Sequence, residues 1–305
     1  PAIPGAPIEP VFGPEIASQV QGNVLPGFNK PFQHFLFLRF GDIEQSKAWL
    51  RELLSSITAL DEVLAWVRLF RYRRGSEGRR DVGLRATWLN VAISARGLRQ
   101  LLTKSQLAEL QDQSFLQGMA ERSTYLGDPS DPAHAGHRGR WVVGGPQNEA
   151  DLMVIIASDL ESDLEDRVRD VRTRAKNSGL SLVFEQRGAV LPGDLRGHEH
   201  FGFRDGISQP AVRGRASSGE LDFIEPRYMD PGDPKAVLYA KPGRPLVWPG
   251  QFIIGMARQD PQSLLGTAPP LTRYPSWARH GSFVVARRLR QNVTKFWGFV
   301  NATAS

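Results

Sequence analysis

The sequence predicts an α+β protein: a ferredoxin-like sandwich, followed by a second half with too few regular elements to close a core. Two observations support this. Strand and helix patterns alternate over the first 200 residues, and few such patterns occur after residue 207. The 305 residues allow two domains, or one large one, at roughly 100–200 residues per domain. The composition, 41% hydrophobic and 23% charged, is that of a globular chain.

A strand followed by a helix is predicted near the start of the chain. Residues 1–14 are rich in proline and are expected to be an extended arm, whereas residues 34–40 (HFLFLRF) form an apolar run of strand length. Asp42 fits a helix N-cap, with Gln45 three residues further on. The next apolar positions have the i, i+3, i+4, i+7 spacing of a helix face: Leu50, Leu53, Leu54 and Ile57.

The next elements are two strands and a helix. Residues 63–72 and 87–93 are strand-like, and residues 94–102 have a helical pattern. Residues 125–150 are rich in Gly, Pro and Asp and predict a long excursion.

A second strand and helix pair follows the excursion. Residues 152–157 (LMVIIA) are apolar on both faces, which is typical of a central strand. Residues 180–186 predict another strand. Between them, Gly179 is a suitable C′ residue for a helix whose apolar stripe is Leu160, Leu164, Val168, Val171 and Ala175. The first domain is therefore assigned to residues 15–200.

Residues 201–305 are different. Only residues 251–255 (QFIIG) and 282–287 (SFVVAR) predict strands, and residues 290–300 predict a helix. Because an isolated pair of strands is marginal in water, these elements give no closed core. Either the loops hide further structure, or this domain is unfinished at Ser305.

Composition excludes several kinds of chemistry. With no cysteine, the chain has no disulfide framework, thiolate metal site, Fe–S cluster or Cys nucleophile. The net charge of +6 permits an anionic partner, but we interpret the basic stretches 71–80 and 287–290 as solvated strand ends and predict no nucleic-acid binding. No apolar run approaches about 18 residues and no export signal begins the chain. We therefore expect a soluble protein without membrane contact, cytoplasmic or secreted, with the cytoplasm favoured.

The most distinctive segment is 198–210 (HEHFGFRDGISQP). Gly202 and Gly206 flank Asp205, so that the backbone can turn tightly and hold a carboxylate at a loop tip. If its side chain meets that carboxylate, Arg204 would help to keep Asp205 ionised. Taken alone, this pattern is more often an ordinary turn.

The segment 202–206 (GFRDG) resembles the GxxDG motif of the dye-decolourising (DyP-type) heme peroxidases. Four other segments resemble motifs of the same family in the same order: 20–25 (VQGNVL), 89–93 (LNVAI), 248–255 (WPGQFIIG) and 281–297 (GSFVVARRLRQNVTKFW). Five collinear matches make this resemblance far more specific than any single motif.

The resemblance implies two ferredoxin-like domains that hold heme b near their junction. It implies that Asp205 is the distal acid–base residue, which takes a proton from hydrogen peroxide and assists cleavage of the O–O bond. Bulky phenols, dyes or other one-electron donors would be the reductants. The neighbouring residues of the motif are expected to bind the cofactor: Gly202, Phe203, Arg204, Gly206, Ile207 and Gln209.

The sequence also departs from the family. The proximal histidine and the distal arginine of the family lie after the segment that resembles 281–297, and this chain has no such motif. We expect a second polypeptide to supply both, so that this is the larger chain of a heterodimeric or nicked enzyme. A truncated chain and a degenerate homologue without heme are the two alternatives. The alternative function is a heme-free scaffold or interaction subunit that keeps the DyP fold.

None of the chain's histidines occupies the family's proximal position. His198 and His200 share one strand face and form a possible metal pair, but two histidines lack further ligands and we interpret them as ordinary loop residues. No metal site is predicted from this chain's own residues. The remaining histidines are interpreted as loop or solvated positions: His34, His134, His137 and His280.

Overall fold

The computed structural model describes residues 7–77, 83–204, 206–207 and 209–303. Its first half is built on a four-stranded antiparallel sheet in the order β2-β3-β1-β4. The strands are β1 (Phe32–Arg39), β2 (Thr87–Ile93), β3 (Leu152–Ser158) and β4 (Ser181–Ala189). This order, with helices between β1 and β2 and between β3 and β4, is the ferredoxin-like arrangement. It confirms the predicted α+β fold class.

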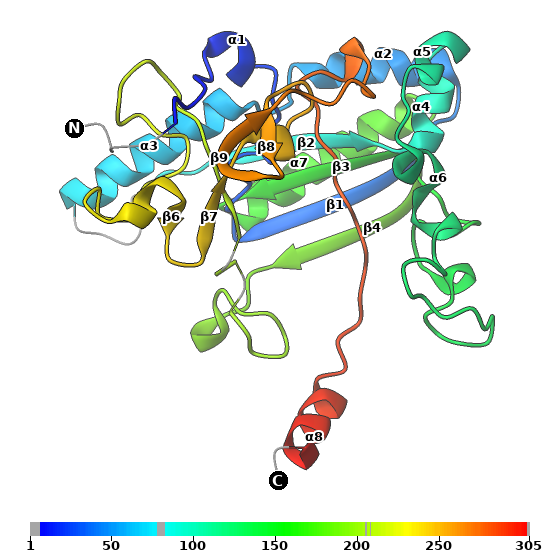
Figure 1. Ribbon diagram of the computed structural model, residues 1–305. Helices are drawn as coiled ribbons and strands as arrows, with labels where there is room; N and C mark the ends of the chain where they lie inside the picture. Colours follow the sequence, from blue (N-terminus) through cyan, green and yellow to red (C-terminus); the bar gives the residue numbers. More distant parts are fainter. Residues whose placement is uncertain (1–6, 78–82, 205, 208, 304–305) are drawn as a thin grey trace.

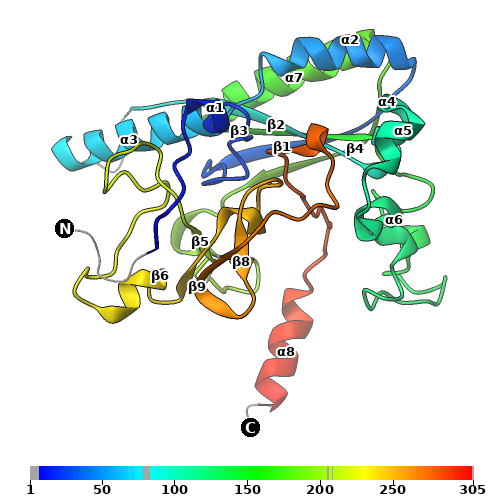
Figure 2. The ribbon, with the colours of Figure 1, turned by 45° about the horizontal axis from the view of Figure 1, so that its top comes forward.

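Two helices cover one face of the sheet (Figure 2). All seven residues of β3 are buried, as expected of a central strand. Its alternate residues Leu152, Val154 and Ile156 face α2 (Ile43–Leu54) and α7 (Glu161–Asn177). The buried side chains of these two helices are Ser46, Trp49, Leu53, Leu164, Val168, Val171 and Ala175. Sheet and helices together form the main core.

The predicted helix boundaries are confirmed, although one apolar position is not. The Asp42 carboxylate accepts a hydrogen bond from Gln45 N at 2.9 Å and caps α2. Gly179 ends α7 with a φ of +76°, which glycine adopts without strain. Leu54, predicted to face the core, is 64% exposed, because the buried face of α2 is centred on Trp49 and Leu53 and Leu54 lies outside it.

The prediction of a strand over 63–72 is wrong, because this segment lies in helix α3 (Leu60–Glu77). Its β-branched and aromatic residues favour a strand, but the apolar positions Leu60, Val63, Leu64 and Val67 have helical spacing. Within α3, the rings of Trp66 and Phe70 stack at 5.1 Å, one turn apart. Tertiary burial on the second face of the sheet decided the conformation.

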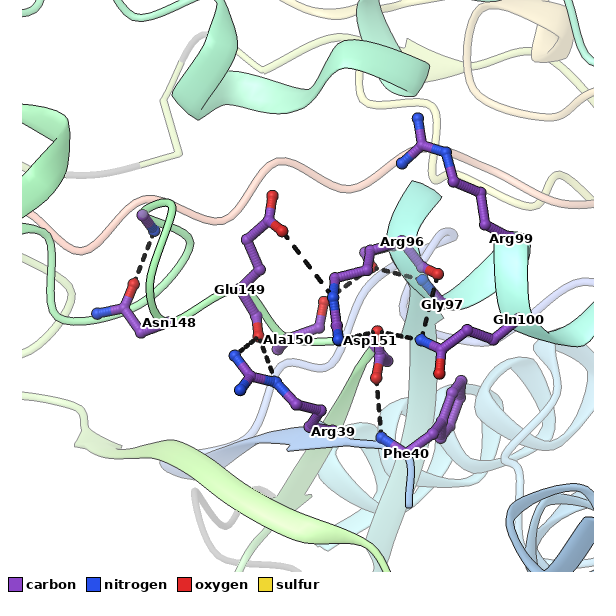
Figure 3. A network of polar contacts seen from close by, with 12 residues as sticks. Arg39, Phe40, Arg96, Gly97, Arg99, Gln100, Asn148, Glu149, Ala150 and Asp151 are labelled. Atoms are coloured by element: carbon purple, nitrogen blue, oxygen red, sulfur yellow. Dashed lines mark hydrogen bonds and ion pairs between the residues drawn. The ribbon is translucent and has the colours of Figure 1, made fainter. Parts of the chain in front are cut away.

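The excursion begins after three short helices, α4 (Ala95–Leu101), α5 (Lys104–Ala108) and α6 (Gln113–Glu121), and contains the single turn η1 (Arg138–Arg140). Asp151 anchors its end (Figure 3). The Asp151 carboxylate is fully buried and accepts hydrogen bonds from Arg96, from Gln100 Nε2 at 2.8 Å and from Phe40 N at 2.8 Å. This network joins the excursion to α4 and the end of β1.

The second half consists of short elements. Strands β5 (Ala211–Val212), β6 (Tyr239–Lys241) and β7 (Arg244–Val247) form one small sheet, and β8 (Arg258–Asp260) pairs with β9 (Ser263–Ala268). The single turn η2 (Gly193–Leu195) precedes these strands, η3 (Pro234–Val237) and η4 (Pro249–Gln251) lie between them, and η5 (Ser276–Ala278) follows them. The sequence predicted none of the five strands, because β5 to β8 have only two to four residues and the six residues of β9 (SLLGTA) do not alternate between apolar and polar.

Both strands predicted in the second half are wrong. Residues 251–255 form the end of η4 and a turn, in which Ile253 is buried and Gly255 has a φ of +86°. Residues 282–287 have the sequence pattern of a strand but do not form one, because no strand of the described chain pairs with them. The predicted terminal helix is confirmed as α8 (Val293–Thr303), which lies apart from the other helices (Figure 1).

The N-terminal arm packs against the second half. Phe12 is buried, and its N–H donates to Arg215 O at 2.7 Å. The Glu9 carboxylate binds Arg227 at 2.6 Å and Gly214 N at 2.8 Å. Helix α1 (Pro14–Ala17) follows directly. The domain boundaries expected from the sequence stay predictions. In the described part of the chain, no helix has the length and apolarity needed to cross a membrane.

Candidate functional site

The candidate site is the loop between β4 and β5. His198 and Arg204 form an isolated antiparallel bridge, and the turn between them is closed by two backbone hydrogen bonds. Glu199 N donates to Phe203 O at 3.0 Å, and Gly202 N donates to Glu199 O at 2.9 Å. Gly202 has a φ of +96°, a conformation that only glycine adopts without strain. The residues before Asp205 therefore form a defined turn.

The Glu199 side chain folds over this turn. Its carboxylate accepts hydrogen bonds from Phe201 N at 2.9 Å, from Phe203 N at 2.8 Å and from Gln291 Nε2. Partial desolvation opposes ionisation, but these donors and nearby His200 outweigh it, so that the pKa of Glu199 is below its ordinary value. Glu199 is therefore a carboxylate at neutral pH.

Asp205, the predicted catalytic residue, lies outside the described residues, and its role stays a prediction. The predicted cofactor-binding residues share one property, which is exposure to solvent: Gly202, Phe203, Arg204, Gly206, Ile207 and Gln209. Phe203 and Ile207 are large apolar side chains that are 56% and 57% exposed. These residues are therefore accessible to a ligand or a second polypeptide.

The C-terminal helix α8 packs its first turn on the loop. The rings of Phe201 and Phe296 are 4.4 Å apart, and Trp297 stacks on Phe203 at 6.2 Å. Trp297 Nε1 donates to Phe201 O at 3.1 Å. Contacts between residues about 95 positions apart thus hold this side of the loop.

The segment that leads to α8, residues 282–292, is held by arginines. Arg287 pairs with Asp128 of the excursion and lies 5.3 Å from the Trp141 ring. Arg288 Nε donates to Gln186 Oε1 of β4 at 2.8 Å. Large apolar side chains of the same segment remain exposed, by 43–75%: Phe283, Val284, Val285 and Leu289.

Two surface hollows lie away from the loop. One, of about 560 Å³, is lined by residues of α4, α5 and α6, and the other, of about 450 Å³, by residues of β2 and α7. Neither is lined by a residue of the loop. Within the described residues, no group of three or more His, Asp or Glu side chains has the geometry of a metal site.

Sequence reasoning missed the residues that support the loop: Glu199, Gln291, Phe296 and Trp297. In the sequence, Glu199 stands out only as the residue between two histidines. Gln291 and Trp297 lie in the segment 281–297, whose resemblance gave a signal of relatedness but not of contact. A hydrogen bond between residues 92 positions apart has no signature in a single sequence.

The strand order and the packing of α2 and α7 define the first half as a ferredoxin-like α+β domain. Residues 19–192 match the model of the DyP dimeric alpha+beta barrel domain, and the chain belongs to this DyP family.

Similar proteins carry the same assignment. The chain is 29% identical over 284 residues to the dye-decolorizing peroxidase msp1 of Mycetinis scorodonius, a match that covers 93% of this chain and 45% of the relative. It is similar to the structure of an ancestral D-type dye decolorizing peroxidase, with a TM-score of 0.67 and 26% identity over 94% of this chain and 52% of the other. A dye-decolorizing peroxidase in complex with 2,6-dimethoxyphenol has a TM-score of 0.63 and 25% identity, and the match covers 93% of this chain and 52% of the other. The chain spans about half the length of the relatives it matches.

If a heme were bound, the described loop residues would contact it from one side only and would not form a closed site. A heme needs an axial ligand directed into a cavity with apolar walls. Phe203 and Ile207 supply exposed apolar surface. His200, considered as an axial ligand, is exposed to solvent and is not enclosed in a cavity. His198 Nδ1 is shielded from solvent and, among the described residues, has no hydrogen-bond partner. The described part of this chain does not by itself enclose a heme.

Proposed function

We propose that this chain is the larger chain of a two-chain, heme-dependent DyP-type peroxidase, heterodimeric or nicked, and carries the distal side of the heme site. The second polypeptide supplies the axial histidine and a distal arginine. The observation that carries this proposal is the loop of residues 198–209: a glycine turn that precedes Asp205, with apolar side chains that stay exposed although α8 packs beside them. Family membership supports the peroxidase part of this proposal.

Asp205 is proposed as the acid–base residue. As a carboxylate, it accepts a proton from one oxygen of hydrogen peroxide and returns it to the other oxygen, which leaves as water when the O–O bond breaks. The bound heme supplies the iron and the electrons for this cleavage. The electron donor is a phenol or a dye-like molecule, which agrees with the 2,6-dimethoxyphenol complex of a similar protein.

The test is the rate at which the heme-loaded two-chain enzyme reacts with hydrogen peroxide, followed by stopped-flow absorbance. D205N removes the proton acceptor and should slow this reaction by roughly 10²–10⁴-fold with unchanged heme content. The matched control is D194N, at an exposed aspartate of η2 in the same connection. Equal rates in D205N and D194N would assign proton transfer to another residue and refute the proposed role.

A further inference from the structure

Glu199 is the meeting point of two segments that are far apart in the sequence. Its carboxylate accepts hydrogen bonds from the amides of Phe201 and Phe203 in its own segment and from Gln291 Nε2 in the C-terminal segment. An ionised carboxylate only accepts hydrogen bonds, and its two oxygens have room for all three donors. The residue type therefore matches the donors that surround it.

Gln291 binds the turn in both directions. While its Nε2 donates to Glu199, its Oε1 accepts from His200 N at 3.2 Å. Trp297 Nε1 adds a third polar link, to Phe201 O. These polar links between residues 291–297 and the turn thus reach positions 199–201, directly before the glycine turn.

The aromatic contacts follow the same path. Phe203 lies 5.9 Å from Phe296 and 6.2 Å from Trp297, and the latter two rings contact each other at 5.4 Å. Because the Phe203 amide is held by Glu199, the position of its ring depends on this carboxylate. The Glu199 carboxylate and the rings of α8 therefore act on the same two residues, Phe201 and Phe203.

We propose that Glu199 is a positioning residue that couples the seating of residues 291–297 to the conformation of residues 201–204, the segment that leads into Asp205. The link to catalysis rests on the proposed function. The coupling itself concerns only contacts within this chain. A polypeptide that docks on α8 would, through Glu199, also set the shape of the loop.

The test uses amide hydrogen exchange of the whole protein at single-residue resolution, at one pH. In E199Q the side chain keeps one acceptor and turns a donor toward the N–H groups, so that the amides of Phe201 and Phe203 should exchange about tenfold faster. The matched control is E220Q, at an exposed glutamate in another loop. Equal exchange of both amides in E199Q and E220Q would overturn the proposal.

A double variant separates coupling from loss of structure. Q291E places a second carboxylate against Glu199 and should speed exchange at both amides, because like charges repel. In E199Q/Q291E the amide of residue 199 can donate to the carboxylate of residue 291, and exchange at both amides should be slower than in Q291E alone. No recovery in the double variant would show that residues 199 and 291 are not coupled and would overturn the proposal.

Peroxide reactivity is a separate readout in the same variants. If exchange follows the pattern above while the heme-loaded enzyme shows no peroxide reaction, the coupling stands and the proposed function fails. If the enzyme reacts and exchange is unchanged in E199Q, the proposed function stands and the coupling fails.

Discussion

The first half of the chain buries its apolar side chains, whereas many apolar side chains near the C-terminus are exposed. In the first half, apolar side chains of β1, β3, α2 and α7 are buried between sheet and helices. Near the C-terminus, apolar side chains of the same kinds remain exposed: Val285 and Leu289 by 75% and Phe299 by 67%. A run of strand-forming residues becomes a strand only when a neighbouring strand pairs with it, and residues 282–287 lack that neighbour in the described chain.

The contrast shows how each half obtains its stability. Sheet and helices of the first half bury each other in the main core, and a second buried cluster packs Leu60 and Leu64 of α3 against residues of the second half such as Ile253. The C-terminal segment is instead held by polar contacts at Arg287, Arg288 and Gln291 and by a few ring contacts, such as those of Phe296 and Trp297. Such contacts fix the position of the segment. Its exposed apolar side chains remain in water, so that the hydrophobic effect does not stabilise the segment there.

The largest expected effect compares two leucines. Leu164 lies in the main core and is 1% exposed, whereas Leu289 is 75% exposed. L164A leaves a cavity and should lower the free energy of unfolding by about 2–5 kcal/mol. L289A should change it by less than about 0.5 kcal/mol. Urea unfolding followed by circular dichroism measures both, and a cost in L289A equal to that in L164A would show that the second half closes a core of its own.

A smaller effect is expected when two carboxylates are compared, each of which accepts hydrogen bonds from three donors. Asp151 is fully buried in the first half, and Glu199 is partly exposed in the second. D151N turns an amide donor toward buried donors and should cost about 1–3 kcal/mol of the free energy of unfolding. E199Q should leave the global unfolding midpoint unchanged, because its effect is confined to the loop. The same urea titration tests both, and a shift in E199Q as large as in D151N would contradict the comparison.

The sequence predicted the first half well where local signals and burial agree. The Asp42 N-cap, the central strand at 152–157 and the stripe that ends at Gly179 each carry a complete local signal. The strand prediction for 63–72 was wrong because the residue types favour strands, while the spacing of the apolar residues buries one face of a helix. The strand prediction for 251–255 was wrong because the chain turns at Gly255, where a strand would continue.

The tight turn of the candidate loop was predictable from the sequence, but the contacts that hold the loop were not. The glycines around Asp205 indicated a tight turn, and Gly202 and Gly206 do have positive φ values. The contacts of Glu199 with Gln291 and of Phe201 with Trp297 depend on how distant segments pack, and neither propensity nor periodicity encodes such packing.

Our main proposal is that another polypeptide completes the second half, which then holds heme. The most direct measurement is the intact mass, combined with the absorbance spectrum, of the protein purified from its natural source. We predict a Soret band that elutes with this chain and a second polypeptide. This chain eluting alone, with no Soret band and no specific Soret shift on addition of hemin, would contradict it and favour the heme-free scaffold.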